Sequence, residues 1–296
     1  MSTSGNCVLI GIFDGVHAGH QELLKSAAKY GKVIALTFYP HPTSILAPER
    51  TPMQLLPLKD RIEQLKAHGA NEVVVIDFNR EFAGLSPDQF IAEILVKQLG
   101  ASHVVVGENF TFGHKAEGTA KYLKESVNNF ETTIVKLSEN RGNPISSSRI
   151  RGLIFDGDVE RASELLTRNH YLVGPVVHGE KRGRKIGYPT ANIGLDPLAC
   201  VPADGVYAGW LTVEGMRWAA AISIGTNPTF PGDRNRQVEA YALDEKDLEL
   251  YDKSAIIEFG WRLRDTLKFD SLEALLIQMK ADCDQSAKLT GFIRPN

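Results

Sequence analysis

Residues 11–20 (GIFDGVHAGH) include residue types that could bind and react with a phosphate group. They follow an apolar run and turn through glycines into a helix-like stretch, where backbone N–H groups and the helix dipole favour an anion. His17 and His20 are three residues apart, so both imidazoles can project toward one site, and Gly19 leaves room for a ligand. Paired imidazoles can stabilise negative charge that builds on a phosphate. The alternative is that one histidine caps the helix and the other is solvated.

In the second half of the chain, oxygen donors recur on a segment with extended character. Thr190 and Asn192 are two residues apart, so their side chains point the same way and can jointly approach one Mg²⁺ ion and its phosphates. As an alternative, residues 189–192 (PTAN) could be a turn closed by the asparagine.

Glu239 is a carboxylate in a segment with the pattern of a barrel strand. Along residues 238–243 (VEAYAL) it shares a face with Tyr241 and Leu243, which we expect inside a small barrel. A carboxylate on an interior face is costly unless it has a chemical role or a partner. We therefore predict a functional group at Glu239. The alternative is a reversed register that puts this side chain in water.

The elements that must position these residues alternate between strands and helices over the first half of the chain. Five continuous apolar runs have the length and β-branched content of strands buried on both faces. They cover residues 7–13, 33–38, 72–76, 103–106 and 132–137, and helix-like segments lie between them at 20–30, 58–68, 87–99 and 119–128. Ser86 and Gln89 have the spacing of a capping box at the start of the third helix. This repeat predicts an α/β domain with a Rossmann-like parallel sheet.

The second half changes character at about residue 169. Short alternating runs at residues 205–211, 218–224, 238–243 and 254–259 predict an antiparallel barrel or sandwich. A terminal helix is expected over residues 271–288, with a packing stripe of Leu272, Leu275, Leu276 and Met279. Residues 148–167 have helical character and join the halves. The predicted domains are therefore 1–167, which is α/β, and 168–296, an antiparallel β-barrel with a terminal helix.

Composition limits the classes of protein to consider. The 296 residues are 43% hydrophobic and 23% charged, which is typical of a globular protein. Residues 1–167 contain 17 Lys and Arg against 19 Asp and Glu, and the rest contain 16 against 17, so neither half is basic enough to indicate nucleic-acid binding. Cys7, Cys200 and Cys283 have no metal-binding spacing. With no signal peptide or membrane-length apolar stretch, we expect a cytoplasmic protein without membrane or nucleic-acid partners.

The first half resembles the HxGH nucleotidyltransferases, and among them the FMN adenylyltransferase half of the bacterial bifunctional riboflavin kinase/FAD synthetases. The resemblance rests on GIFDGVHAGHQ at residues 11–21 and on three segments that follow later strands: FYPHP at 38–42, GENFTFG at 107–113 and SSSRIR at 146–151. It implies adenylyl transfer from ATP to FMN, giving FAD and pyrophosphate.

This resemblance also implies roles for individual residues. His17 and His20 would stabilise the transition state. Ser147, Ser148 and Arg151 would cradle the ATP phosphates, which suits hydroxyls and a guanidinium, the alternative being a serine N-cap and a surface arginine. The other residues implied in nucleotide or substrate binding are Gly11, Phe13, Asp14, Gly15, Gly19 and Asn109.

The second half resembles riboflavin kinases. The resemblance rests on GRKIGYPTAN at residues 183–192, on the strand with Glu239, and on the tail from Arg264 onward. It implies ATP-dependent phosphorylation of riboflavin to FMN, with Glu239 as the base at the ribityl 5′-hydroxyl. Thr190 and Asn192 would hold Mg²⁺. The residues implied in nucleotide or substrate binding are Gly183, Gly187, Pro189 and Arg264.

The sequence departs from this family pattern at three positions. Asn109 stands where many members have Asp, and Ala116 where many have Arg, so Lys115 or Lys121 could supply the charge instead. Asp252 follows Tyr251 where Gly is usual. His41, between two prolines, is either a polar loop residue or part of a substrate-binding loop.

Two other functions are compatible with parts of the sequence. An adenylyltransferase of another small phosphate substrate would explain the first half but not PTAN or Glu239. A non-catalytic flavin-binding sensor would not need His17, His20, Thr190, Asn192 and Glu239 together. We therefore expect riboflavin, FMN and ATP as ligands and Mg²⁺ as the cofactor. The sequence leaves self-association open.

Overall fold

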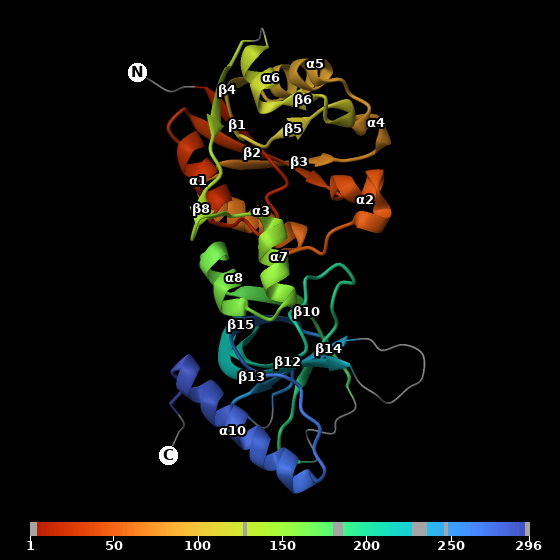
Figure 1. Ribbon diagram of the computed structural model, residues 1–296, viewed down its shortest axis with the longest axis vertical. Coiled ribbons are helices and arrows are strands. Elements are labelled where there is room, and N and C mark those ends of the chain that lie inside the picture. The colour runs from red at the N-terminus through yellow and green to blue at the C-terminus, as the bar shows by residue number, and fades with distance from the viewer. Residues whose placement is uncertain (1–4, 127–128, 180–185, 227–235, 246–247, 294–296) are drawn as a thin grey trace. The chain divides into compact units, whose positions relative to one another are not determined.

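The computed structural model describes residues 5–126, 129–179, 186–226, 236–245 and 248–293 (Figure 1). Contacts divide the chain into two compact units, Met1–Ser147 and Ser148–Asn296. An α/β unit is followed by a β-barrel unit with a terminal helix, so the predicted fold class is confirmed. In the part of the chain that the structure describes, every helix is too short or too polar to cross a membrane.

The first unit is built on a parallel sheet of five strands in the order β3-β2-β1-β4-β7. The strands are β1 (Asn6–Ile10), β2 (Lys32–Tyr39), β3 (Glu72–Asp77), β4 (Ala101–Gly107) and β7 (Glu131–Val135). The three central strands are buried over most of their length, whereas the edge strands β3 and β7 are half-buried. Burial on both faces is the reason that the central strands have continuous apolar runs.

Helices cover both faces of this sheet. Figure 1 shows α1 (Ala18–Ala27) and α3 (Leu58–Ala67) on one side, and α5 (Pro87–Gln89) and α6 (Ala120–Glu125) on the other. The predicted capping box is present, since Ser86 and Gln89 exchange backbone-to-side-chain hydrogen bonds. Beyond Gln89 the helix continues as a π-helix, η2 (Phe90–Gln98).

Short elements at the edges of the first unit were not expected from the sequence. They are the helices α2 (Pro42–Leu46) and α4 (Arg80–Ala83), the 3-10 turns η1 (Pro48–Arg50) and η3 (His114–Ala116), and two small hairpins. The hairpins pair β5 (Thr111–Phe112) with β6 (Gly118–Thr119), and β8 (Glu139–Asn140) with β9 (Asn143–Pro144).

The second unit begins with the predicted helical stretch, which forms two helices, and continues into a closed antiparallel barrel. The helix α7 (Ser147–Phe155) starts at the last residue of the first unit, and α8 (Val159–Leu166) packs on β15 and β10. The strand order is β10-β11-β14-β13-β12-β15. The strands are β10 (His170–Val177), β11 (Ala191–Ile193), β12 (Gly205–Val213), β13 (Met216–Thr226), β14 (Arg236–Ala242) and β15 (Ser254–Arg264).

The faces of β14 are the reverse of our expectation. Val238, Ala240 and Ala242 belong to the core inside the barrel. Tyr241 and Leu243 lie on the outer face, where they pack with the terminal helix. The prediction that Glu239 lies on the interior face was therefore wrong. The inside of a barrel with few strands is narrow. Large side chains of other strands, such as Tyr207 and Phe259, fill it, so the inward residues of β14 are small and its large ones pack under the helix.

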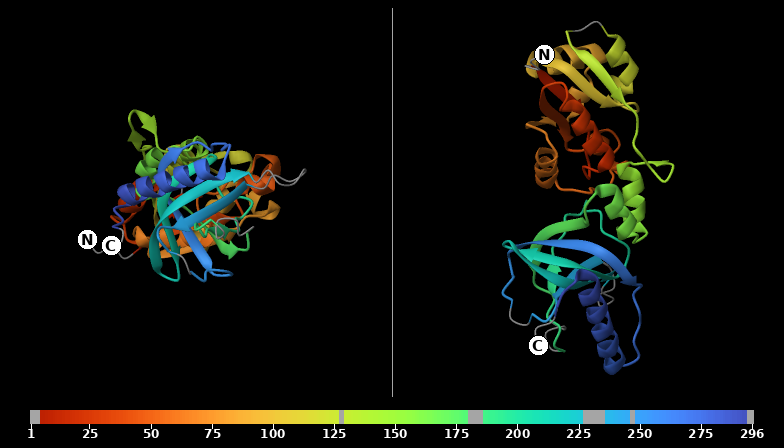
Figure 2. Two further views of the ribbon diagram at one scale, coloured as in Figure 1. Left: turned by 90° about the horizontal axis from the view of Figure 1, so that it is seen from below. Right: turned by 90° about the vertical axis from the view of Figure 1, so that its left-hand side faces the viewer.

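The terminal helix α10 (Leu272–Thr290) lies against the outside of the barrel (Figures 1 and 2). Its buried residues are Asp282, Cys283, Ser286 and Ala287. The predicted stripe is half-buried at Leu275, Leu276 and Met279, and Leu272 is 58% exposed. The prediction of a core stripe was wrong at Leu272, because the helix packs most closely through its second half.

Candidate active sites

The segment between β1 and α1 forms a tight turn whose backbone is held from two neighbouring elements. Phe13 and Val16 adopt left-handed conformations, with φ of 54° and 41°, which such residues adopt only when their surroundings hold them there. The Ile12 carbonyl accepts hydrogen bonds from Thr37 Oγ1 at 3.0 Å and from Arg61 Nη1 at 2.7 Å. Because these donors come from β2 and α3, a strand and a helix together fix the start of the turn.

Asp14, which we expected to bind nucleotide or substrate, anchors this turn. Its side chain is 4% exposed, and Oδ1 accepts from the backbone N–H groups of Leu55 at 3.0 Å and Leu56 at 3.2 Å. Its carbonyl accepts from Ser147 Oγ at 2.8 Å. Asp14 thus ties the loop before α3 to the turn, and a direct contact with a ligand stays a prediction.

The two histidines come together, as their spacing predicts. The rings of His17 and His20 are stacked, with centroids 3.6 Å apart and an angle of 17° between planes, and the Phe13 ring lies edge-on to His20 at 5.3 Å. His17 occupies the N-cap position of α1 but makes no side-chain capping hydrogen bond. The alternative in which a histidine serves as the helix cap is therefore not observed.

The environment of His20 keeps its ring neutral. Burial lowers the pKa of His20 well below its usual value, and the positive charges of His17 and Arg61 act in the same direction. Within the described residues, His20 Nδ1 is buried and has no hydrogen-bond partner. A neutral imidazole carries one N–H, so His20 can offer a hydrogen bond to a phosphate without first taking up a proton.

Two glycines of the motif make room for its own aromatic rings. A Cβ at Gly11 would lie 2.9 Å from the Phe13 ring, and a Cβ at Gly19 would lie 3.3 Å from the His17 ring. Gly15 has a φ of 84°, which favours glycine. The space that we assigned to a ligand at Gly19 is therefore needed at least in part by His17.

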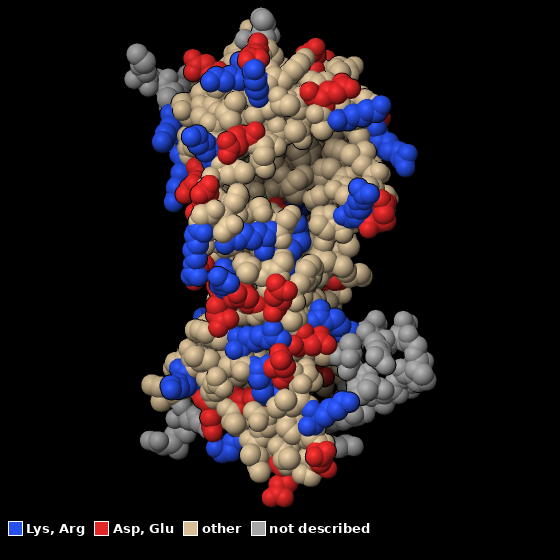
Figure 3. Space-filling view, in the orientation of Figure 1, with Lys and Arg blue, Asp and Glu red and all other residues tan. Residues whose placement is uncertain are grey.

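The carboxyl end of the sheet opens into a cavity of about 730 Å³. Gly11 and Ile12 at the start of the turn line it, together with α2, α4 and the segment from β5 to η3. In Figure 3 the surface is hollowed at this place, between the elements labelled α2, α4 and β5 in Figure 1. Six phenylalanines line the cavity: Phe38, Phe78, Phe82, Phe90, Phe110 and Phe112. This size and lining suit a large aromatic ligand.

The serines and the arginine of residues 146–151 fall on both sides of the boundary between the units. Ser147 belongs to the first unit and is hydrogen-bonded to the turn through Asp14. Ser148 and Arg151 follow on α7 and belong to the second unit. Their roles at the phosphates stay predictions.

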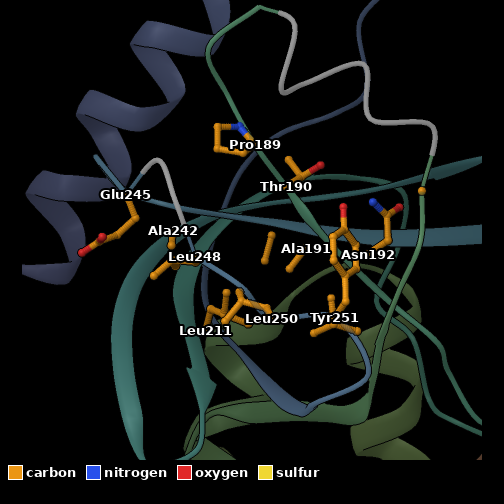
Figure 4. Close-up of a pocket in the computed structure, with 13 residues that line it drawn as sticks. Pro189, Thr190, Ala191, Asn192, Leu211, Ala242, Glu245, Leu248, Leu250 and Tyr251 are labelled. Carbon is orange, nitrogen blue, oxygen red and sulfur yellow. The ribbon is translucent and has the colours of Figure 1, made fainter.

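The second candidate site lies where β11 meets β14. Thr190 Oγ1 donates to Glu239 Oε2 at 3.1 Å, and Asn192 lies opposite Glu239 in the register of the two strands. Figure 4 shows Thr190 and Asn192 on one side of their segment and Ala191 on the other. Although Glu239 lies on the outer face of the barrel, it is half-buried and close to both predicted metal ligands.

The cavity beside this site is much smaller than the one in the first unit. It measures about 60 Å³ and is lined by Pro189, Thr190, Asn192 and Tyr251 among others. The described residues contain no cluster of three or more His, Cys, Asp or Glu that could hold a metal. A metal at this site would therefore depend on the hydroxyl, amide and carboxylate oxygens of Thr190, Asn192 and Glu239.

Three further residues of the second unit were predicted to bind nucleotide or substrate: Gly183, Gly187 and Arg264. Gly183 lies outside the described residues, and Gly187 has a φ of 89°. Arg264 forms a two-pronged ion pair with the buried Asp282, with Nη2–Oδ2 and Nε–Oδ1 distances of 2.6 and 2.9 Å. This pair ties β15 to α10. Binding of a ligand by Arg264 stays a prediction.

Two family models match this chain in succession. The model described as FAD synthetase matches residues 1–149, and the model described as riboflavin kinase matches residues 166–290. A relative from Bacillus subtilis (strain 168), named bifunctional riboflavin kinase/FMN adenylyltransferase, is 36% identical over 96% of this chain and 92% of its own length. The chain belongs to the bifunctional riboflavin kinase/FMN adenylyltransferase family.

Further comparisons agree on the length and the fold. A relative of the same name from Listeria monocytogenes is 38% identical over 92% of this chain and 88% of its own. A crystal structure described as a macrolide-efflux protein from Streptococcus pneumoniae has a TM-score of 0.87 and 36% identity, and the match covers 97% of this chain and 95% of that one. The fold of the whole chain therefore has a solved counterpart.

The positions that depart from the family pattern can now be placed. Lys115 and Ala116 line the large cavity, whereas Lys121 pairs with Glu125 along α6 at 3.7 Å. Lys115 is therefore the lysine that could supply charge there, and Asn109, six residues before it, is exposed. Asp252 has a φ of 62°, a left-handed conformation that favours glycine.

Several residues at these sites were missed or undecided from the sequence. His41 Nδ1 accepts from the backbone N–H of Thr43 at 3.2 Å, so His41 caps α2, while Pro42 lines the cavity. Phe78 and Phe82 come from the segment after β3, and no motif marks them. Their common signal is that they follow the carboxyl end of a strand, where ligands bind in open α/β sheets.

Proposed function

We infer that this chain makes FAD from riboflavin in two steps, each using ATP. Riboflavin is phosphorylated to FMN, and FMN then receives an adenylyl group from a second ATP with release of pyrophosphate. The observation that carries this inference is that the two family matches occupy separate stretches of one chain, and each stretch has a candidate site of its own.

The test is a direct assay of products. The protein is incubated with riboflavin, ATP and Mg²⁺, and the flavins are separated by chromatography. We expect FMN to appear first and FAD to follow. A protein that binds flavin but leaves riboflavin and FMN unchanged would instead be a flavin-binding sensor, and adenylylation of another phosphate substrate alone would contradict the kinase step.

For the kinase step, we propose Glu239 as the base that takes the proton of the ribityl 5′-hydroxyl. Its hydrogen bond from Thr190 supports a shared site for base and metal. Thr190 and Asn192 supply the hard oxygen donors that Mg²⁺ prefers, and the ion would neutralise charge on the transferred phosphoryl group. Pro189, Gly187 and Gly183 would contact the nucleotide, and Arg264 the flavin end of the site.

For the adenylyl transfer, we propose that the FMN phosphate attacks the α-phosphorus of ATP beside His17 and His20. An ionised phosphate is already a nucleophile, so the two imidazoles serve to stabilise developing charge. Ser147, Ser148 and Arg151 would hold the leaving pyrophosphate. The cavity lined by phenylalanines and joined to the turn through Gly11 and Ile12 suits the isoalloxazine ring of FMN.

We further propose that the functional domains are residues 1–167 and 168–296. The family matches leave residues 150–165 to neither domain, and by contacts these residues belong to the second unit. Fragments that begin at residues 148 and 168 test the boundary, because a kinase that needs α7 and α8 would be active only in the longer one. Location in the cytoplasm stays a prediction, and self-association stays open.

A further inference from the structure

Arg61 is a buried cation that no motif points to. It lies on α3 and is 4% exposed. Nη1 is bound to the Ile12 carbonyl at 2.7 Å, whereas Nε is buried and has no hydrogen-bond partner among the described residues. A buried charge with an unmet donor is costly and needs a compensating interaction or a function.

The hydrogen bond of Arg61 acts on the backbone of the histidine motif. Ile12 directly precedes Phe13, the first residue of the turn in a left-handed conformation. Phe13 in turn places its ring edge against His20. Because Thr37 binds the same carbonyl, the peptide that begins the turn is fixed by two donors, and Arg61 is the charged one.

The charge of Arg61 acts on the histidines themselves. The titratable groups that interact with Arg61 are Asp14 of the turn, His20 of α1 and Tyr39 at the end of β2, and His20 in turn interacts with His17. Burial lowers the pKa of Arg61, and electrostatic interactions with Asp14 and Tyr39 act against that change. An arginine keeps its proton at neutral pH, so a positive charge stays close to His20.

We propose that Arg61 is a positioning residue for adenylyl transfer, which fixes the Ile12 carbonyl and supplies a permanent positive charge close to the His17–His20 pair. This inference rests on the proposed function of the two histidines. A site whose positive charge comes from an arginine keeps that charge throughout the neutral pH range. His20 then stays neutral and available as a hydrogen-bond donor, and the phosphates still enter a positive field.

Two substitutions separate the charge of Arg61 from its hydrogen bond. Arg61→Lys keeps the charge and loses the forked geometry. Arg61→Gln keeps an N–H donor of similar reach and loses the charge. Lys59→Gln removes an exposed positive charge from the first turn of the same helix and serves as the matched control. For each variant we would measure FMN adenylylation from pH 5 to 8, riboflavin phosphorylation, and the pKa of His20 by NMR of labelled histidine.

We expect Arg61→Gln to raise the pKa of His20 toward its usual value and to shift the acid limb of the adenylylation profile to higher pH. Its kcat should fall by about 10²-fold, as for a misplaced catalytic group, with KM for ATP and FMN within about twofold, as expected of a residue that acts through the turn and not on the ligands. Arg61→Lys should lower kcat by less and leave the pKa of His20 in place. Lys59→Gln should match the parent, and all variants should phosphorylate riboflavin normally.

The outcomes distinguish this inference from the proposed function. If the parent protein makes no FAD from FMN and ATP, the proposed function fails. If the parent is active and Arg61→Gln changes neither kcat nor the pKa of His20, only the inference fails. Equal losses in both variants with an unchanged His20 pKa would make Arg61 merely structural. If Arg61→Gln does not fold, Arg61→Lys decides, because a raised His20 pKa or an unchanged kcat in that variant would overturn the proposal.

Discussion

The two units present their functional groups in different ways. In the first unit a strained turn holds His17 and His20 through backbone contacts from β2 and α3, beside a cavity of about 730 Å³. In the second unit Thr190 and Glu239 hold each other, and the cavity beside them measures about 60 Å³. A parallel sheet ends at one edge where loops can enclose a ligand. A narrow barrel is filled by its own side chains, and the proposed base Glu239 lies on an outer face.

The contrast predicts that each set of groups serves one reaction only, and the largest effect should come from the base. Glu239→Gln keeps the size of the side chain but cannot accept the hydroxyl proton, so riboflavin phosphorylation should fall by about 10²–10⁴-fold. Adenylylation of supplied FMN should be unchanged. Both rates are read from the same chromatographic assay.

Binding measurements show whether the loss of riboflavin phosphorylation in Glu239→Gln comes from the chemical step or from weaker binding of the substrate. Riboflavin affinity, followed by flavin fluorescence, should stay close to that of the parent. A Glu239→Gln protein that binds riboflavin and ATP and turns over at nearly the parent rate would remove Glu239 from the mechanism. The position of Glu239 on the outer face of β14 would then have no role in catalysis.

The matching change in the first unit should have a somewhat smaller effect. His20→Ala removes a fixed donor to charge that develops on the α-phosphate, and such losses cost about 10²–10³-fold in rate. FAD formation from FMN should fall by this factor while riboflavin phosphorylation continues. Equal loss of both activities in a folded protein would show that the two sites are coupled, and normal FAD synthesis would make His20 structural.

The sequence predicted those features that depend on local patterns. The five strands of the parallel sheet were found because each has a continuous apolar run of strand length. The spacing of three residues at a helix start predicted that His17 and His20 come together, although it did not predict that their rings stack. In the second unit, β10 was missed because Gly174 and Pro175 interrupt its apolar run. The apolar runs and the spacing of the two histidines can each be judged from a few neighbouring residues.

Other features depend on which face of an element meets the rest of the fold. Alternation along β14 separates Glu239 and Tyr241 from Ala240, but it does not say which set lies inside the barrel. Arg61 belongs to a helix with the sequence LKDRIEQLKA, in which an arginine resembles a surface charge. Its burial depends on residues far away in sequence, such as Ile12, whose carbonyl accepts a hydrogen bond from Arg61. The cavity lined by phenylalanines likewise combines separate loops.

Each unit contains a buried histidine whose pKa is lowered by burial, His20 in the first unit and His170 in the second. His170 in the barrel unit is 1% exposed, and its Nε2 lies 2.8 Å from the Cys200 carbonyl. Burial lowers its pKa to about 4, the hydrogen bond to Cys200 opposes this, and Arg168 adds to it. Unlike Nδ1 of His20, Nε2 of His170 has a hydrogen-bond partner, and no candidate site described above includes His170, so its effect should be on stability alone.

The stability of the barrel unit should therefore fall in acid. The unfolded chain binds a proton at His170 near pH 6.5, whereas the folded chain does so only near pH 4. Stability from this group is full above pH 6.5 and is lost as the pH falls toward 4, in total about 3 kcal/mol. All three tryptophans lie in the barrel unit, so urea unfolding followed by tryptophan fluorescence reports this unit. In His170→Gln the decline should be smaller, and an unchanged decline would contradict the assignment.

The smallest expected effect concerns the cavity of the first unit. Phe110 lines it and stacks on Phe112, with ring centroids 5.5 Å apart and an angle of 11° between planes. Phe110 is half-buried, so its ring can contact a flavin without being central to the core. Stacking between aromatic rings contributes about 0.5–1.5 kcal/mol. Phe110→Ala should therefore raise KM for FMN in adenylylation by about threefold to tenfold.

The same variant should leave KM for ATP and the kinetics of riboflavin phosphorylation unchanged. Tyr122→Ala is the matched control, because Tyr122 is an exposed aromatic residue of the same unit that does not line this cavity. If Phe110→Ala changes KM for FMN no more than Tyr122→Ala does, the flavin ring does not occupy this cavity. The cavity at the carboxyl end of the parallel sheet, which distinguishes the first unit from the barrel unit, would then not explain where FMN binds.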